Sequence, residues 1–156
     1  MNEPPAIIPL ISSSVSGPLG ACHLPRLWAK VLLDAKGRLP AGYRSGIGGF
    51  DEAVCEALGI DAAAFVAFVR AALPTYDACE AWVRATTSGL DAGRLGEFNR
   101  YVAMRELEDG RAAERRAALG ISDVHVRRAV ALNDLEDWRA FHAGLTQESA
   151  TDPSAD

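Results

Sequence analysis

Residues 22–37 read CHLPRLWAKVLLDAKG and carry the strongest helix signal in the chain. Pro25 suits the first turn of an α-helix, because the N–H that proline lacks has no partner at that position. Four apolar residues follow at intervals of three and four, and these are Leu27, Trp28, Val31 and Leu32. Such spacing places them on one face of a helix, and Gly37 predicts where the helix ends. The stretch therefore predicts an amphipathic helix that packs its apolar face against a core.

Helical spacing continues through most of the chain, so we predict an all-α fold. Asp61, Thr75 and Asp91 each precede an apolar run with this period and suit helix N-caps. Asp51 is expected to cap a shorter helix of its own. No run alternates apolar and polar residues for long enough to predict a strand, and residues 121–126 are the one ambiguous stretch.

Three further signals lie in the C-terminal half. The helix that follows Asp91 is expected to kink or end at Gly110, and Ser122 is expected to begin a helical turn. Asn133 and Glu136 lie three residues apart and form a capping-box signature for a last helix. The apolar face of that helix is predicted to consist of Trp138, Phe141 and Leu145.

A chain of 156 residues fits a single domain, because it can remove about two thirds of its unfolded surface from water. We predict a compact helical bundle of five to seven helices over residues 18–145. Residues 1–17 are rich in proline and serine and predict an extended N-terminal arm, whose isoleucines favour docking on the body. Residues 146–156 are small, polar and acidic, and predict a flexible tail.

Charge and cysteine content exclude several classes of function. A net charge of -5 opposes binding to a polyanion, so no nucleic-acid partner is expected. No apolar run approaches the roughly 20 residues that span a bilayer, and the chain does not start like a signal peptide, so no membrane association is expected. Three cysteines without a close pair do not form a disulfide framework. We therefore expect a cytoplasmic protein.

One basic concentration occurs late in the chain. It consists of Arg111, Arg115, Arg116, Arg127 and Arg128. Acidic residues are interleaved with these arginines, which favours a salt-bridged face turned to solvent over a nucleic-acid surface.

The first helix carries the most informative polar residues. His23, Arg26 and Lys30 recur at intervals of three and four, so a helix gathers them on one stripe opposite its apolar face. Exposed N–H groups and the macrodipole at the helix start attract negative charge. The stripe therefore suits an anion site with Arg26 and Lys30 as binding groups, although it is equally compatible with the solvated side of an amphipathic helix.

A glycine-rich segment, residues 37–50, follows this helix and predicts a loop. Tyr43 and Arg44 within it offer a phenol and a guanidinium that can clamp a carboxylate. Gly48 and Gly49 offer free backbone N–H groups to an anion, and Asp51, shortly after them, is a further binding candidate that could also assist His23 in acid–base work. The segment lacks a GK[ST] motif, so tight turns alone are the alternative explanation of its glycines.

Candidate catalytic groups cluster in the same region. His23 is the proton-transfer candidate, with Cys22 or Tyr43 assisting. A histidine at a helix start is more often a cap or a satisfied core residue, which is the alternative. Asn99 and Arg105 lie on a later helix and are secondary binding candidates if that helix forms a wall of the site. No CxxC or HExxH motif is present, so no metal and no cofactor are expected.

Several stretches together are similar to a known family. They are PLGACHLPRLWAKVLLDAKGRLPAGYRSGIGGFDEAVCEALGID, ALPTYDACEAWV and DLEDWRAFH. In these stretches the chain resembles the bacterial domain-of-unknown-function family 5069, and the similarity covers most of residues 18–142. The resemblance implies a helical fold and a bacterial cytoplasmic setting, and names no substrate.

Two functional hypotheses follow from the residues. In the first, the protein binds an anionic small organic molecule, bearing a carboxylate or a phosphate, at the first helix and the glycine-rich loop, and acts as a cofactor-independent acid–base enzyme if His23 transfers a proton. In the second, it is a non-catalytic helical interaction module that docks or forms a homodimer through its apolar arm.

Overall fold

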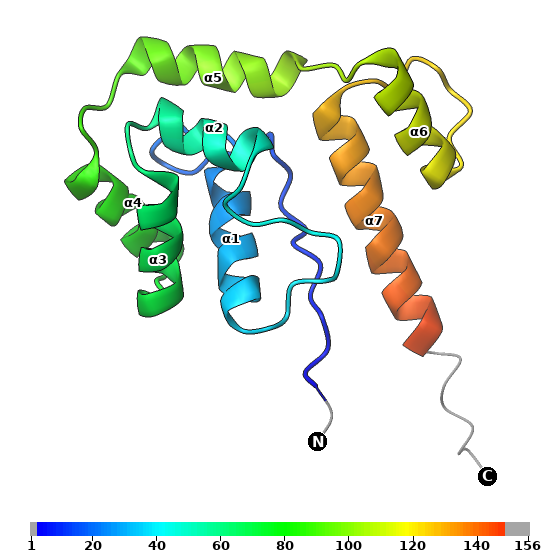
Figure 1. The fold of residues 1–156 in the computed structure, drawn as a ribbon, viewed down its shortest axis with the longest axis horizontal. Helices are drawn as coiled ribbons and strands as arrows, with labels where there is room; N and C mark the ends of the chain where they lie inside the picture. Colours follow the sequence, from blue (N-terminus) through cyan, green and yellow to red (C-terminus); the bar gives the residue numbers. More distant parts are fainter. Residues whose placement is uncertain (1–2, 149–156) are drawn as a thin grey trace.

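The computed structural model describes residues 3–148, and these form seven α-helices and no strand (Figure 1). The helices are α1 (Leu24–Ala35), α2 (Gly49–Ala57), α3 (Ala62–Ala72), α4 (Tyr76–Thr86), α5 (Ala92–Met104), α6 (Asp109–Leu119) and α7 (Ala129–Glu148). The predicted all-α fold is confirmed. Helix α7 includes residues 146–148, and the rest of the predicted tail lies outside the described residues.

The helices fall into two groups that α5 connects. Figure 1 shows α1 to α4 on one side and α6 and α7 on the other, with α5 running across the end of the first group toward the second. The N-terminal arm passes between α1 and α7 in an extended conformation. The arm and the loop between α1 and α2 therefore occupy the space where the two groups of helices meet.

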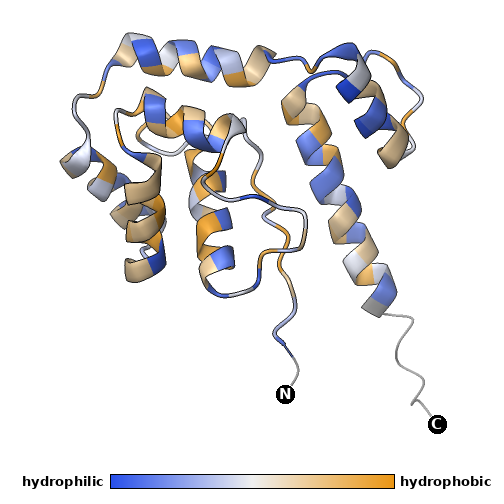
Figure 2. Cartoon of the chain, viewed as in Figure 1, coloured by the Kyte–Doolittle hydropathy of each residue, from blue (hydrophilic) through white to orange (hydrophobic). Residues whose placement is uncertain are grey.

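Most of the hydrophobic core lies within the first group. Leu24, Leu27 and Val31 of α1 are fully buried, together with Phe65 and Val69 of α3. Figure 2 shows the contrast between these helices and α6, in which hydrophilic residues take a larger share. From α6 and α7 the buried apolar residues are Ala112, Ala129 and Leu132. The second group of helices therefore depends more on polar contacts for its position.

The prediction that the apolar residues of the last helix face the core is wrong. Trp138, Phe141 and Leu145 are all exposed, with Trp138 at 59%. The face of α7 that meets the body carries Leu132 and the buried Asp137 instead. An ion pair, and not an apolar stripe, sets the rotation of this helix, as described below.

Three predicted caps are confirmed by hydrogen bonds. The side chains of Asp61, Thr75 and Asp91 accept from the backbone N–H of the residue three positions later. The capping role expected of Asp51 is wrong, because α2 begins at Gly49 and Asp51 lies buried in its first turn.

The second half departs from the prediction at its helix boundaries. The helix after Asp91 ends at Met104, well before Gly110, and α6 begins at Asp109. Residues 121–128 are not helical, so the helical turn expected at Ser122 is absent. Leu107 N donates to Arg127 O and Ala129 N donates to Arg105 O, and this short antiparallel pairing begins α7 early. Asn133 and Glu136 therefore lie inside α7 and form no capping box.

Candidate functional site

The carboxylate of Asp51 is the centre of a buried polar cluster. Its Oδ1 accepts from His23 Nε2 at 2.6 Å and from Lys30 Nζ at 2.7 Å. Its Oδ2 accepts from Lys30 Nζ at 2.7 Å and from the N–H of Gly46 at 2.9 Å. Burial alone would raise the pKa of Asp51, but the hydrogen bond from His23 and the charge of Lys30 outweigh it and lower that pKa. Asp51 is therefore a stable anion inside the protein.

His23 holds the start of α1 against this carboxylate. It is the N-cap residue, in the left-handed conformation with φ 71°, and only 2% of it is exposed. Its Nδ1 lies 2.9 Å from Ser13 Oγ, and its ring packs edge-on against Phe50. Burial lowers the pKa of His23 more than the hydrogen bond and charge of Asp51 raise it. In the neutral tautomer that follows, Nε2–H donates to Asp51 and the Ser13 hydroxyl donates to Nδ1.

Ser13, His23 and Asp51 thus form a chain of the residue types used in serine hydrolases. Ser13 is fully buried and does not line the pocket described below, so its hydroxyl is not placed for attack on a ligand. The chain instead orients the imidazole, and through it the carboxylate. The sequence offered no signal for Ser13, because it lies among three consecutive serines of the arm.

Lys30 is the second cation on Asp51 and points toward the pocket. The residue is 8% exposed, and burial lowers its pKa more than Asp51 raises it. An ammonium group has three N–H donors, of which the two oxygens of Asp51 engage two. The third N–H has no hydrogen-bond partner among residues 3–147 and remains for a ligand.

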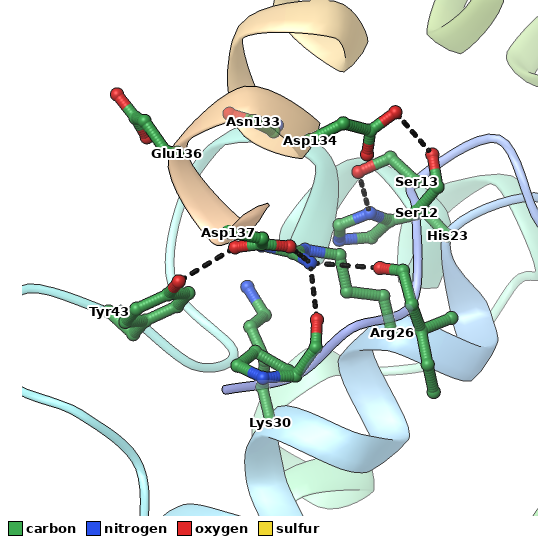
Figure 3. A network of polar contacts seen from close by, with 12 residues as sticks. Ser12, Ser13, His23, Arg26, Lys30, Tyr43, Asn133, Asp134, Glu136 and Asp137 are labelled. Atoms are coloured by element: carbon green, nitrogen blue, oxygen red, sulfur yellow. Dashed lines mark hydrogen bonds and ion pairs between the residues drawn. The ribbon is translucent and has the colours of Figure 1, made fainter. Parts of the chain in front are cut away.

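A second buried cluster joins α1 to α7. Arg26 donates to Asp137 Oδ2 at 2.6 Å and to Oδ1 at 3.2 Å. The same guanidinium donates to the carbonyls of Pro9 and Ile11 in the arm. Figure 3 shows Asp137 between Arg26 and Tyr43, whose hydroxyl donates to Oδ1 at 2.7 Å. Burial and then this hydrogen bond raise the pKa of Tyr43, so its phenol stays protonated as a structural donor.

A pocket of about 400 Å³ opens beside the two clusters. One wall comes from α1, from the part of the glycine-rich segment that precedes α2 and from the start of α2. The other wall comes from the linker between α5 and α6 and from the facing sides of α6 and α7. The sequence-predicted residues that line it are His23, Arg26, Lys30, Arg44, Gly48, Gly49, Asp51 and Arg105. The fold therefore gathers most of the candidates around one concavity.

Three candidates lie elsewhere. Tyr43 contacts Asp137 and does not line the pocket. Cys22 donates its thiol to Ser14 O, and burial raises its pKa, which disfavours the reactive thiolate. Asn99 accepts from the N–H of Cys22 and donates to Gly20 O, so it ties α5 to the chain just before α1. These positions give Asn99 a supporting place next to His23 rather than one in the pocket wall.

Sequence reasoning missed the contribution of α6 and α7. Arg111, Arg115 and Asn133 line the pocket. Arg115 donates to Asn133 Oδ1 and pairs with Glu136 at 2.7 Å. Arg111 and Arg115 are four residues apart, a spacing that places them on one face of a helix. That signal was available, but the sequence did not show which face of α6 meets the body.

The structure also bears on metals, disulfides and membranes. Cys22, Cys55 and Cys79 are not joined by disulfides. Within residues 3–148, no three His, Cys, Asp or Glu side chains are grouped closely enough to hold a metal ion. None of the helices in this part of the chain combines the length and apolarity needed to cross a membrane.

The fold and the site define a class of protein: an all-helical domain with a cationic pocket built on a buried His–Asp–Lys cluster. A comparison with protein families identifies the group. Residues 11–148 match the family described as "Domain of unknown function (DUF5069)", and the chain belongs to this family. A search of curated proteins found no match.

Proposed function

We propose that this protein binds a small anionic organic molecule in the pocket beside α1. One observation carries the proposal. Six Arg and Lys residues line the pocket with a single acidic residue, although acidic residues outnumber basic ones by 21 to 16 in the whole chain. The lining acid, Asp51, already accepts four hydrogen bonds and contributes no free acceptor surface.

The donors available to a ligand come from several elements. Lys30 offers its third N–H, and the side chains of Arg44 and Arg111 have no ion pair or hydrogen bond among the described residues. Gly48 and Gly49 bring the N-terminus of α2 to the pocket, where the Gly48 N–H donates to Glu52 Oε2 and the Gly49 N–H has no partner among the described residues. Guanidinium, ammonium and backbone N–H groups are the donors that bind carboxylates and phosphates in proteins. These donors therefore support binding of a carboxylate or of a phosphate group.

Arg26 has a different place in this proposal from the one that the sequence suggested. Its guanidinium is engaged by Asp137 and by two arm carbonyls, so it supports the pocket wall instead of clamping the ligand. Its replacement would disturb the fold together with the site. Arg44 is the better test position, because its side chain is exposed.

Proton transfer is a further part of the proposal. Both ring nitrogens of His23 are hydrogen-bonded, so a transfer from the imidazole to a ligand requires one of these bonds to break. Lys30 faces the pocket with a donor to spare and a lowered pKa, which favours it as the group that exchanges a proton with a bound acid. His23 and Asp51 then hold the ammonium in place. We also propose a bacterial cytoplasmic setting, and the three unpaired cysteines support its reducing, cytoplasmic part.

The binding proposal can be tested by calorimetric titration with inorganic phosphate and with citrate at constant ionic strength. We expect saturable binding to the wild type and weaker binding to Arg44→Gln. Arg84→Gln, which removes the same charge from an exposed position on α4, is the matched control and should bind as the wild type does. Identical titrations for all three proteins would contradict the proposal.

A specific observation favours a second function, the interaction module. A groove of about 370 Å³ between the arm and α7 is lined by apolar side chains, among them Leu10 and Phe141, which are 48% and 45% exposed. A second copy of the chain is the proposed occupant, because its own arm and α7 would present the same apolar residues in a two-fold arrangement.

Sedimentation tests this alternative. We expect a dimer that Phe141→Ser dissociates, while Val124→Ser, another exposed apolar position outside the groove, leaves it intact. A wild-type protein that stays monomeric up to about 1 mM, the affinity limit of a weak complex, would contradict it. Deletion of the arm is unsuitable here, because Ser13 and the carbonyls of Pro9 and Ile11 belong to the buried clusters.

A further inference from the structure

The cations that line the pocket divide into two sets. In the first set, each cation already has a carboxylate partner. Lys30 pairs with Asp51 at 2.7 Å, and Arg115 pairs with Glu136 at 2.7 Å. Arg26 is likewise held by Asp137. These three charges are compensated within the protein.

The second set has no such partner. It consists of Arg44, Arg105 and Arg111. Among residues 3–147, none of these three guanidinium groups lies within ion-pair distance of a carboxylate. Arg105 donates to the hydroxyl of Tyr101 and lies over its ring, which are contacts with a neutral group. The pocket therefore carries three positive charges that the protein does not neutralise.

These three arginines come from three separate elements. Arg44 lies in the glycine-rich loop, Arg105 follows the end of α5, and Arg111 lies in the first turns of α6. A solvated helix face would supply its charges from one element. Here the tertiary fold brings like charges to one concavity, which costs electrostatic free energy unless an anion occupies it.

We infer, on the basis of the proposed function, that the ligand of this pocket is a small organic molecule with at least two negative charges on oxyanion groups. A single carboxylate would neutralise one of three uncompensated arginines. Two carboxylates, or a phosphoryl group, can pair with at least two of the three guanidinium groups and suit their preference for paired oxygen acceptors.

The rest of the lining fits an organic skeleton on these groups. Ile47, Phe50, Leu107 and Ala129 supply apolar surface between the cations. A volume of about 400 Å³ lies within the usual range of small-molecule sites, about 300 to 1,000 Å³. The Gly49 amide at the start of α2 adds a donor suited to a phosphoryl oxygen, whereas the Gly48 amide already donates to Glu52 Oε2.

Titration with simple anions of increasing charge tests the inference. The probes are acetate, succinate and citrate in one series and inorganic phosphate and pyrophosphate in the other, at constant ionic strength so that screening does not vary. We expect citrate or pyrophosphate to bind at least tenfold more tightly than acetate. The series with the stronger binding assigns carboxylate or phosphoryl chemistry.

Variants add a second measure. Arg44→Gln and Arg111→Gln should each weaken binding of the preferred probe about tenfold, the lower end of the contribution of a charged hydrogen bond. The double variant should lose the preference for high charge, and Arg84→Gln should keep it. All three arginines of the second set are exposed, so these substitutions preserve the fold.

The outcomes separate this inference from the function on which it rests. If multiply charged probes bind less than tenfold more tightly than acetate, while Arg44→Gln still weakens binding, the inference is overturned and the anion-binding function stands. If Arg44→Gln and Arg111→Gln bind every probe as tightly as the wild type does, both the inference and the anion-binding function are overturned.

Discussion

Arg26 of α1 and Asp137 of α7 form a buried ion pair between positions 111 residues apart in the sequence. Their side chains are 7% and 4% exposed, and both guanidinium nitrogens reach the carboxylate. The pair fixes the rotation of α7 and so decides that Asn133, one turn earlier, faces the pocket. It also explains why the apolar residues of α7 are left outside the core.

Removing the acidic partner should destabilise the fold strongly. Asp137→Ala leaves Arg26 charged and buried without its carboxylate, and we expect the free energy of unfolding to fall by about 3 to 5 kcal/mol. Tyr43→Phe removes one hydrogen bond to the same carboxylate and should cost about 1 kcal/mol. Urea denaturation measures both, with Glu136→Ala as a control on a more exposed carboxylate. A loss below 1 kcal/mol for Asp137→Ala would show that the pair does not hold the helices together.

His23 should make stability depend on pH in the mildly acidic range. The pKa of a histidine in an unfolded chain is about 6.5, and burial lowers that of His23 in the folded state. Below pH 6.5 the unfolded chain therefore binds more protons than the folded one, and the free energy of unfolding decreases as the pH falls. Asp51 acts in a different window, because its stabilising effect is lost only as the pH falls below the usual carboxylate pKa of about 3.9 and through its lowered folded value.

Urea denaturation at pH 7 and pH 5 measures this dependence. His23→Gln should show a smaller decrease between the two pH values than the wild type, whatever its stability at pH 7. His125→Gln removes an exposed histidine and should keep the wild-type decrease. An unchanged decrease in His23→Gln would assign the pH dependence to another group.

Lys30→Met tests the ammonium that holds Asp51. The charge of Lys30 and its hydrogen bonds lower the pKa of Asp51, so the variant should have a higher Asp51 pKa, measured by carboxyl ¹³C NMR against Asp51→Asn. Lys36 is the other lysine of the chain and lies exposed at the end of α1. Lys36→Met should leave the Asp51 titration unchanged. An Asp51 pKa in Lys30→Met that equals the one in Lys36→Met would exclude Lys30 as the main partner of Asp51.

Two glycine substitutions should have opposite signs. A Cβ at Gly46 would lie 2.4 Å from Val66 Cγ2 on a backbone with φ +80°, so Gly46→Ala should lower the free energy of unfolding by about 1 to 3 kcal/mol. It should also weaken anion binding, since Gly46 N–H holds Asp51. Gly96 lies in α5 with no atom near its Cβ position, and Gly96→Ala should stabilise by about 1 kcal/mol.

Gly42→Ala is the matched control for Gly46→Ala. Gly42 has φ +91° and no atom within 4 Å of its Cβ position, so it carries the backbone strain without the contact. Equal losses of stability for Gly42→Ala and Gly46→Ala would show that Val66 moves aside freely. Thermal unfolding monitored by circular dichroism compares all three variants.

Local interactions account for what could be predicted. The caps at Asp61, Thr75 and Asp91 act on N–H groups three residues away, and the apolar period of α1 is visible within a dozen residues. The stripe of His23, Arg26 and Lys30 was predicted on the same basis. Whether that stripe met solvent or protein depended on elements far along the chain.

The expected caps at Asp51 and Asn133 failed for a shared reason. Each has a side chain suited to capping, but each is engaged by a distant cation, Lys30 for Asp51 and Arg115 for Asn133. Lys30 is buried and Arg115 is partly buried, and cations withdrawn from water need an acceptor more strongly than a helix end exposed to water does. The tertiary contact therefore overrides the local signal.

The sequence by itself determined that the chain is helical, where several helices begin, and which polar residues share the first helix face, because these depend on interactions between near neighbours. Only the tertiary structure decided that this face is buried, that Asp137 and Ser13 complete its hydrogen bonds, and that arginines from three elements converge on one pocket. Charges separated by tens of residues become neighbours only when packing brings their helices together, and no local pattern records that choice.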